Sequence, residues 1–96
     1  MPTFESTEEF NRDFDRLSNE EQAAFDRALE KFIPGVDEGD FLGGLRVKPM
    51  KRAQGIWEMT WAADGRATFE YGEPVKPDMR HVVWRRIGGH EIFRSP

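Results

Sequence analysis

Apolar residues recur every three or four positions through the first third of the chain, which is the spacing of one buried stripe along a helix. Ser6 or Thr7 can cap a first helix, and Phe10, Phe14 and Leu17 form its apolar stripe. The sequence therefore predicts a short amphipathic helix close to the N-terminus.

A second helix is predicted to follow at once. Ser18 and Glu21 form a capping box, in which each side chain accepts a hydrogen bond from the backbone N–H of the other residue. The buried face of this helix comprises Phe25, Ala28, Leu29, Phe32 and Ile33. Pro34-Gly35 is expected to end the helix, because this pair interrupts helical patterns. The two helices are predicted to be antiparallel.

In the second half of the chain the hydrophobic period changes to two, as in strands with one buried face. Two such runs, residues 57–61 and 67–71, flank Ala63-Asp64-Gly65. A three-residue loop whose glycine is left-handed keeps both apolar faces on one side and pairs Met59 with Phe69. We therefore expect an antiparallel hairpin in this register.

The same register puts Glu58 opposite Glu70 on the polar face, which is unfavourable unless a cation lies nearby. A third strand, Val82–Ile87, carries Arg85 and Arg86. Because neighbouring residues of a strand point to opposite faces, one of the two arginines should reach the polar face. The pattern does not indicate which.

The predicted fold class is α+β, with two antiparallel helices packed on one face of a small antiparallel sheet and a polar face left open. Thr3-Phe4 has the pattern of an edge strand. A chain of 96 residues suffices for one core, so residues 1–96 are predicted to form one domain without a buried cofactor.

Composition narrows the classes of function. The chain has no cysteine, and its two histidines lie nine residues apart without a metal-site spacing, so we expect neither a metal nor a cofactor. No apolar run approaches a membrane span, and the N-terminus lacks the pattern of a signal peptide. A cytoplasmic location without a membrane partner is expected.

The net charge of −4 argues against a nucleic-acid partner, but the charge is unevenly distributed. Residues 1–43 carry 12 acidic and 4 basic side chains, whereas residues 44–96 carry 6 acidic and 10 basic ones. The acidic part fits solvated helix faces, and the basic part is suited to a polyanion.

After the two predicted helices, the chain reads VKPMK, GIWEMTW, GRATFEYG and HVVWRRIGGHEIF in this order. This order resembles the RelE/ParE superfamily of bacterial toxins across nearly the whole chain. The resemblance implies a microbial-ribonuclease-like α+β fold, a cognate antitoxin and, commonly, ribosome-dependent cutting of mRNA. ParE-type members act instead on DNA gyrase.

Cutting RNA by attack of a 2′-hydroxyl requires a base, an acid and a cation for the charge of the transition state. Arg66 suits the cationic role, because guanidinium keeps its charge and matches a phosphate. It also matches the position of the family's catalytic arginine. The alternative is a surface arginine paired with Glu58 or Glu70.

Two further residues are candidates for proton transfer. His90 matches a family position where a histidine or arginine assists cleavage, although it could equally be an exposed loop residue. Glu58 is a hypothetical base, because the facing Glu70 would make one of the two carboxylates more basic. The alternative for Glu58 is a carboxylate neutralised by a neighbouring arginine.

Six residues are predicted to contact RNA. They are Lys48, Lys51, Arg52, Arg85, Arg86 and Phe93. The first three cluster around Pro49 and suit backbone phosphates, or else form a solvated loop. Phe93 can stack on a base. The three tryptophans could also stack on bases, but we expect them to pack in the core.

Two features depart from the pattern of RelE-type ribonucleases. Glu58 and Thr60 stand where relatives often have lysine or arginine, and Phe93 stands where many have tyrosine. Phenylalanine cannot donate a proton. The resemblance favours a ribosome-dependent endoribonuclease, whereas these departures favour a ParE-like inhibitor of DNA gyrase. A second alternative is a degenerate toxin that only binds its antitoxin.

Overall fold

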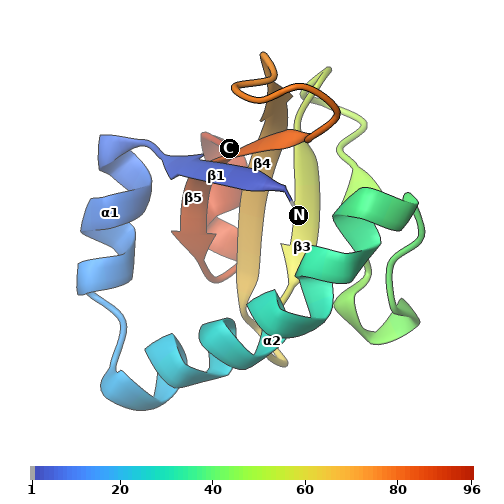
Figure 1. The fold of residues 1–96 in the computed structure, drawn as a ribbon. Coiled ribbons are helices and arrows are strands. Elements are labelled where there is room, and N and C mark those ends of the chain that lie inside the picture. The colour runs from blue at the N-terminus through green and yellow to red at the C-terminus, as the bar shows by residue number, and fades with distance from the viewer. Residues whose placement is uncertain (1) are drawn as a thin grey trace.

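The computed structural model describes residues 2–96 as two α-helices, two short 3-10 helices and one five-stranded sheet (Figure 1). The elements are β1 (Thr3–Ser6), α1 (Glu8–Asp15), α2 (Asn19–Glu38), η1 (Gly43–Leu45), β2 (Lys48–Pro49), β3 (Trp57–Thr60), β4 (Arg66–Gly72), β5 (His81–Gly88) and η2 (His90–Arg94). The strand order is β1-β5-β4-β3-β2, antiparallel except for the parallel pair β1–β5. This arrangement confirms the predicted α+β class.

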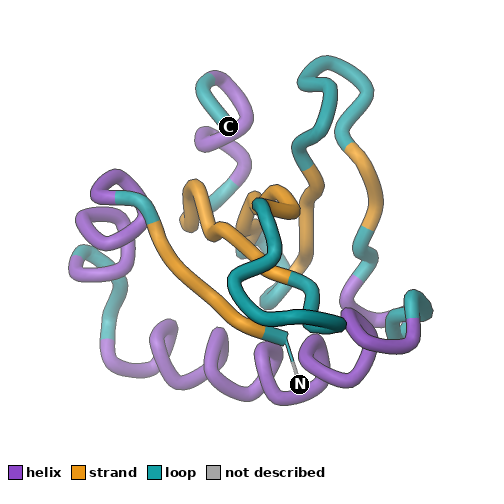
Figure 2. The backbone as a smooth tube through the Cα atoms, turned by 45° about the horizontal axis from the view of Figure 1, so that its top comes forward, coloured by secondary structure: helices purple, strands orange, loops and turns teal. Residues whose placement is uncertain are grey.

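Both helices pack their aromatic residues on the same face of the sheet. Phe10 of α1 and Phe25 of α2 contact the Trp84 ring, and Phe32 of α2 contacts Trp84 and Phe69 at centroid distances of 5.1 Å. In Figure 2 the long helix runs along one side of the strands. The predicted edge strand at Thr3-Phe4 is β1. Within residues 2–96, no helix has the length and apolar character needed to cross a membrane.

Both helices begin where the sequence predicts, whereas α2 ends later than predicted. Thr7 caps α1, and Ser18 and Glu21 form the predicted capping box. The prediction that α2 ends at Pro34-Gly35 is wrong: the helix continues to Glu38 and is capped by the left-handed Gly39. The last turn is held because it places a fully buried valine, Val36, in the core.

The hairpin has the predicted faces in a different register. Met59 pairs with Ala67, and Thr60 with Arg66, so the predicted Met59–Phe69 pair is wrong by two residues. Gly65 closes the turn by donating to the Ala62 carbonyl without a positive φ. It is glycine because a Cβ there would lie 2.5 Å from the Trp61 ring. A shift of two preserves the alternation of faces.

A β-bulge in β5 decides where the two adjacent arginines point. Trp84 pairs with Phe69 and Ile87 with Ala67, and all four belong to the main core. Arg85 is the extra residue that makes this possible, since strict alternation would put Trp84 and Ile87 on opposite faces. Arg85 and Arg86 therefore both leave the core face, whereas alternation alone predicted that only one would.

The polar face of the sheet is partly covered. The C-terminal helix η2 lies on the side of the sheet opposite α2 (Figures 1 and 2) and contacts β4 and β5. Ile56 and Ile92 are buried outside the main core, and Thr68 of β4 is fully buried. The prediction of an open polar face is thus correct only in part, because η2 and these apolar side chains close some of it.

Candidate active site

Arg66 is the first residue of β4 and lies beside the turn between β3 and β4. Its Nη1 donates to the carbonyls of Ala62, Ala63 and Gly65, at 3.0 Å for Gly65. Among the described residues it forms no ion pair with Glu58 or Glu70, which are paired with other cations. The turn therefore orients the guanidinium and leaves its charge available to an anion.

His90 is held by a residue that the sequence did not single out. Its Nδ1 lies 2.6 Å from Oδ1 of Asp64, in the turn between β3 and β4. With Nδ1 engaged by a carboxylate, Nε2 is the ring nitrogen that remains for other partners. The Phe93 ring packs edge-on against the imidazole at 5.8 Å. The imidazole is exposed, and its contact with Asp64 orients the ring.

Arg66 and the Asp64–His90 pair lie at the same end of the sheet. Arg66 pairs with Gly88 in the ladder between β4 and β5, and His90 follows two residues later. Asp64 precedes Arg66 by two residues in the turn. Arg66 and His90 are therefore candidates, at this rim of the sheet, for the cation and for one proton-transfer group of RNA cleavage.

Glu58 does not have the surroundings predicted for it. It faces Thr68, whereas Glu70 faces Val83, so the facing carboxylates expected from the sequence are absent among the described residues. Glu58 lies 3.9 Å from Nζ of Lys48, and its side chain is only 16% exposed. The argument that Glu70 makes Glu58 a better base therefore has no geometric support.

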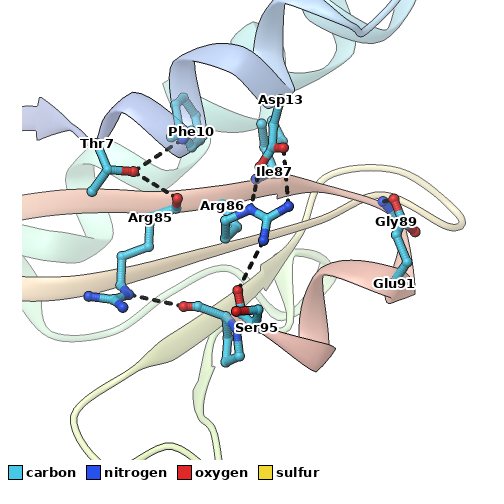
Figure 3. A network of polar contacts seen from close by, with 10 residues as sticks. Thr7, Phe10, Asp13, Arg85, Arg86, Ile87, Gly89, Glu91 and Ser95 are labelled. Atoms are coloured by element: carbon cyan, nitrogen blue, oxygen red, sulfur yellow. Dashed lines mark hydrogen bonds and ion pairs between the residues drawn. The ribbon is translucent and has the colours of Figure 1, made fainter.

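The two bulge arginines are engaged within the protein (Figure 3). Arg86 donates from Nε and Nη2 to the buried carboxylate of Asp13, at 2.6 and 3.2 Å, and from Nη1 to the Ser95 carbonyl. The hydrogen bond with Asp13 raises the pKa of Arg86, against a smaller opposing effect of burial. Arg85 pairs with Glu70 at 3.3 Å and donates to the Pro96 carbonyl.

These contacts tie three separate parts of the chain together. Asp13 on α1 also accepts the backbone N–H of Ile87, and Thr7 donates to the Arg85 carbonyl. Figure 3 shows α1, β5 and the C-terminal residues converging on the two guanidinium groups. Most of the donors of Arg86 are used here, which favours a structural role for this residue over RNA contact.

The predicted phosphate cluster lies away from Arg66. Lys48 is in β2, and Lys51 and Arg52 are exposed in the loop between β2 and β3. This loop enters β3 at Trp57, whereas the turn with Asp64 leaves β3 at the other end. Lys51 and Arg52 are therefore not brought to the rim that holds Arg66 and His90.

A second set of cations lies beside Arg66 instead. Arg27 and Lys31 of α2 and Arg46 after η1 line a groove of about 680 Å³ together with Arg66. No sequence motif marks this set, because Arg27 and Lys31 belong to the acidic part of the chain. Trp61 and Trp84 are buried and Trp57 packs against the core, which confirms the core prediction for the tryptophans.

No protein-family model matches the sequence, and no curated protein is significantly similar to it. The fold does match solved structures. YafQ from E. coli strain BL21(DE3) superposes with a TM-score of 0.69 at 10% identity, over 97% of this chain and 98% of that one. A YoeB/ParE toxin from Agrobacterium tumefaciens gives 0.66 at 15% identity, over 92% and 98%. A chain of the RelB–RelE antitoxin–toxin complex from Methanococcus jannaschii gives 0.58 at 12%, over 93% of both. The chain therefore has the RelE-like toxin fold.

Proposed function

We propose that this protein is the toxin of a type II toxin–antitoxin system, an endoribonuclease that cuts mRNA on the ribosome and so inhibits translation. The observation that carries the proposal is the pair Asp64–His90 at the same rim as Arg66, on a RelE-like fold. The order of motifs in the sequence and the match in fold both support the proposal.

In the proposed reaction, the 2′-hydroxyl attacks the adjacent phosphorus and the bond to the 5′-oxygen breaks, which leaves a 2′,3′-cyclic phosphate. His90 Nε2 either takes the proton of the hydroxyl or supplies one to the leaving oxygen. Arg66 stabilises the negative charge that grows on the phosphoryl oxygens. Phe93, beside His90, can stack on a neighbouring base. Glu58 remains a weaker candidate for the second proton-transfer group.

A cognate antitoxin is part of the proposal. RelE has been crystallised with RelB, and we infer by this likeness in fold that the present chain also has a protein partner that blocks its site. The ribosome and mRNA are the proposed targets. Lys48, Lys51, Arg52 and Arg85 are retained as candidate contacts to ribosomal or messenger RNA, because all carry charge at the surface.

The test is a cell-free translation reaction in which new mRNA 5′ ends are mapped by primer extension. We expect cleavage that requires ribosomes and is lost in Arg66→Ala and His90→Ala. Arg12→Ala on α1 is the matched control, because it removes an exposed arginine that pairs with Glu8 and does not line the groove with Arg66. Cleavage that persists in both site variants would contradict the assignment.

Inhibition of DNA gyrase by protein binding is the second candidate. It is favoured by Glu58, a carboxylate on β3 that is paired with Lys48, and by Phe93, which cannot donate a proton. Intact mRNA together with inhibited supercoiling by gyrase would support this function. Intact mRNA and active gyrase would instead support a degenerate toxin that acts only as an antitoxin-binding partner.

A further inference from the structure

The charged residues that line the groove beside Arg66 are all positive. Its lining contains four cationic residues, Arg27, Lys31, Arg46 and Arg66, and no aspartate or glutamate. We call these four residues and their surface the cationic groove. In a chain with a net charge of −4, such a concentration of positive charge is not an average property of the surface. Mutual repulsion makes it costly unless an anion binds there.

The cations of the groove are not neutralised within the protein. Across residues 2–96, neither Arg27, Lys31 nor Arg46 forms an ion pair, although α2 carries six carboxylates. Arg27 and Lys31 are the only basic residues of α2 and stand one turn apart, so they project toward the same side. The acidic residues of the helix therefore lie outside the groove lining, and its charge faces solvent.

The lining of the groove suits a chain backbone. Besides the cations it includes small residues, among them Ala24, Ala28, Ala62 and Ala63. Short side chains allow a polymer to approach closely, while the long basic side chains reach its charges from the rim. Trp61 is the only aromatic residue in the lining, and it is buried. The groove therefore offers contacts to phosphates and no exposed ring on which bases could stack.

We propose that the cationic groove binds the phosphodiester backbone of single-stranded RNA next to the bond that is cut. This inference rests on the proposed function for the identity of the polymer. Arg66 belongs both to the groove and to the candidate active site, so a strand with its scissile phosphate at Arg66 would have the other three cations of the groove within the same lining. An acidic protein segment would also match the charges, and the test below distinguishes it from RNA.

The test measures binding separately from cleavage. The probe is a short, fluorescently labelled 2′-O-methylated RNA, which lacks the attacking hydroxyl, and its affinity is measured by anisotropy over a range of KCl concentrations without ribosomes. Arg27→Gln/Lys31→Gln removes two groove charges. Arg12→Gln/Lys76→Gln removes two exposed charges outside the groove and is the matched control.

We expect the groove variant to bind at least about tenfold more weakly at low salt, with the slope of log K against log salt shallower by about 1.4 for two lost contacts. The control should match the wild type. Equal affinity and slope in the groove variant, or no binding by the wild type, would overturn the inference. Preferential binding of polyglutamate that is lost in the same variant would assign the groove to an acidic protein segment.

The two proposals can fail separately. Wild-type protein that binds the probe through the groove but leaves mRNA intact on ribosomes would retain the groove and remove the ribonuclease function. Ribosome-dependent cleavage that is unchanged in Arg27→Gln/Lys31→Gln would retain the function and remove the groove. A positioning role predicts that Arg27→Gln/Lys31→Gln raises KM for mRNA on ribosomes with little change in kcat, since Arg27 and Lys31 do not touch the reacting atoms.

Discussion

Among single residues, Asp64 is the one that connects the turn between β3 and β4 to the His90 ring. Its carboxylate holds Nδ1, so replacing it with alanine should release the ring without removing a group that touches the RNA. We expect Asp64→Ala to lower the cleavage rate by about tenfold, a part of the 10²–10⁴-fold that acid–base catalysis supplies. Primer extension measures this rate, and ¹⁵N NMR of the imidazole should show a mixture of tautomers where the wild type shows one.

The control is Asp15→Ala on α1, which removes an exposed carboxylate without a partner in the turn. If Asp64 only stabilised the turn, Asp64→Ala would lower the free energy of unfolding and leave the tautomer of His90 unchanged. If the tautomer and the rate in Asp64→Ala equal those of the wild type, Asp64 does not position His90.

Asp13 has a different role, because it is a buried acceptor for three donors from β5. Replacing it with alanine leaves the Arg86 guanidinium and the Ile87 N–H without their partner. Breaking a buried ion pair costs about 3–5 kcal/mol, and we expect about 2 kcal/mol here because Arg86 is 26% exposed and reaches water. Urea unfolding of Asp13→Ala measures the loss, and Asp15→Ala should unfold like the wild type.

The sequence identified Arg66 and His90 by residue type and by their places in a motif. It could not identify Asp64 or Asp13, because their contacts join positions 26 and 73 residues apart. Such pairs depend on which elements become neighbours. The predicted facing of Glu58 and Glu70 is wrong for a different reason, because the hairpin between β3 and β4 has another register.

At the scale of elements, the turn between β3 and β4 fixes both the register and the site. Gly65→Ala would push a Cβ into the Trp61 ring, so either the ring or the turn must move. We expect a loss of about 1–3 kcal/mol of unfolding free energy, the range found for overpacked sites. Gly43→Ala is the control, because no atom lies within 4 Å of its added Cβ. Equal melting of the two variants would show that the ring does not depend on this glycine.

The same turn explains why the faces of the hairpin were predictable and its register was not. Alternation along 57–60 and 66–72 determines which side chains are buried, and any shift by two residues keeps that choice. The Trp61 ring over Gly65 selects one register, and this contact leaves no periodic signal. The bulge at Arg85 and the extension of α2 beyond Pro34 also depend on tertiary burial, of Ile87 and Val36 respectively.

At the scale of the whole molecule, the division of charge along the chain is a poor guide to the surface. Counting by halves assigns Arg27 and Lys31 to the acidic part, yet the fold brings them beside Arg46 and Arg66. The basic surface is therefore assembled from both halves, at the rim where the hairpin meets α2. An acidic protein can in this way present a local site for a polyanion.

A second, smaller set of buried apolar side chains lies on the face of the sheet opposite α2. One of them belongs to η2, so the stability of this face affects the candidate site. Ile92 is 2% exposed and lies in η2, two residues after His90. We expect Ile92→Ala to cost about 2–4 kcal/mol, as other buried isoleucine truncations do, and to speed hydrogen exchange in η2 before the main core opens. Because η2 carries His90, cleavage should also fall.

Val75→Ala, at a site 66% exposed, is the control. A variant at Ile92 that unfolds and exchanges like the Val75 variant would show that η2 is not anchored through this side chain, and His90 would then depend on Asp64 alone.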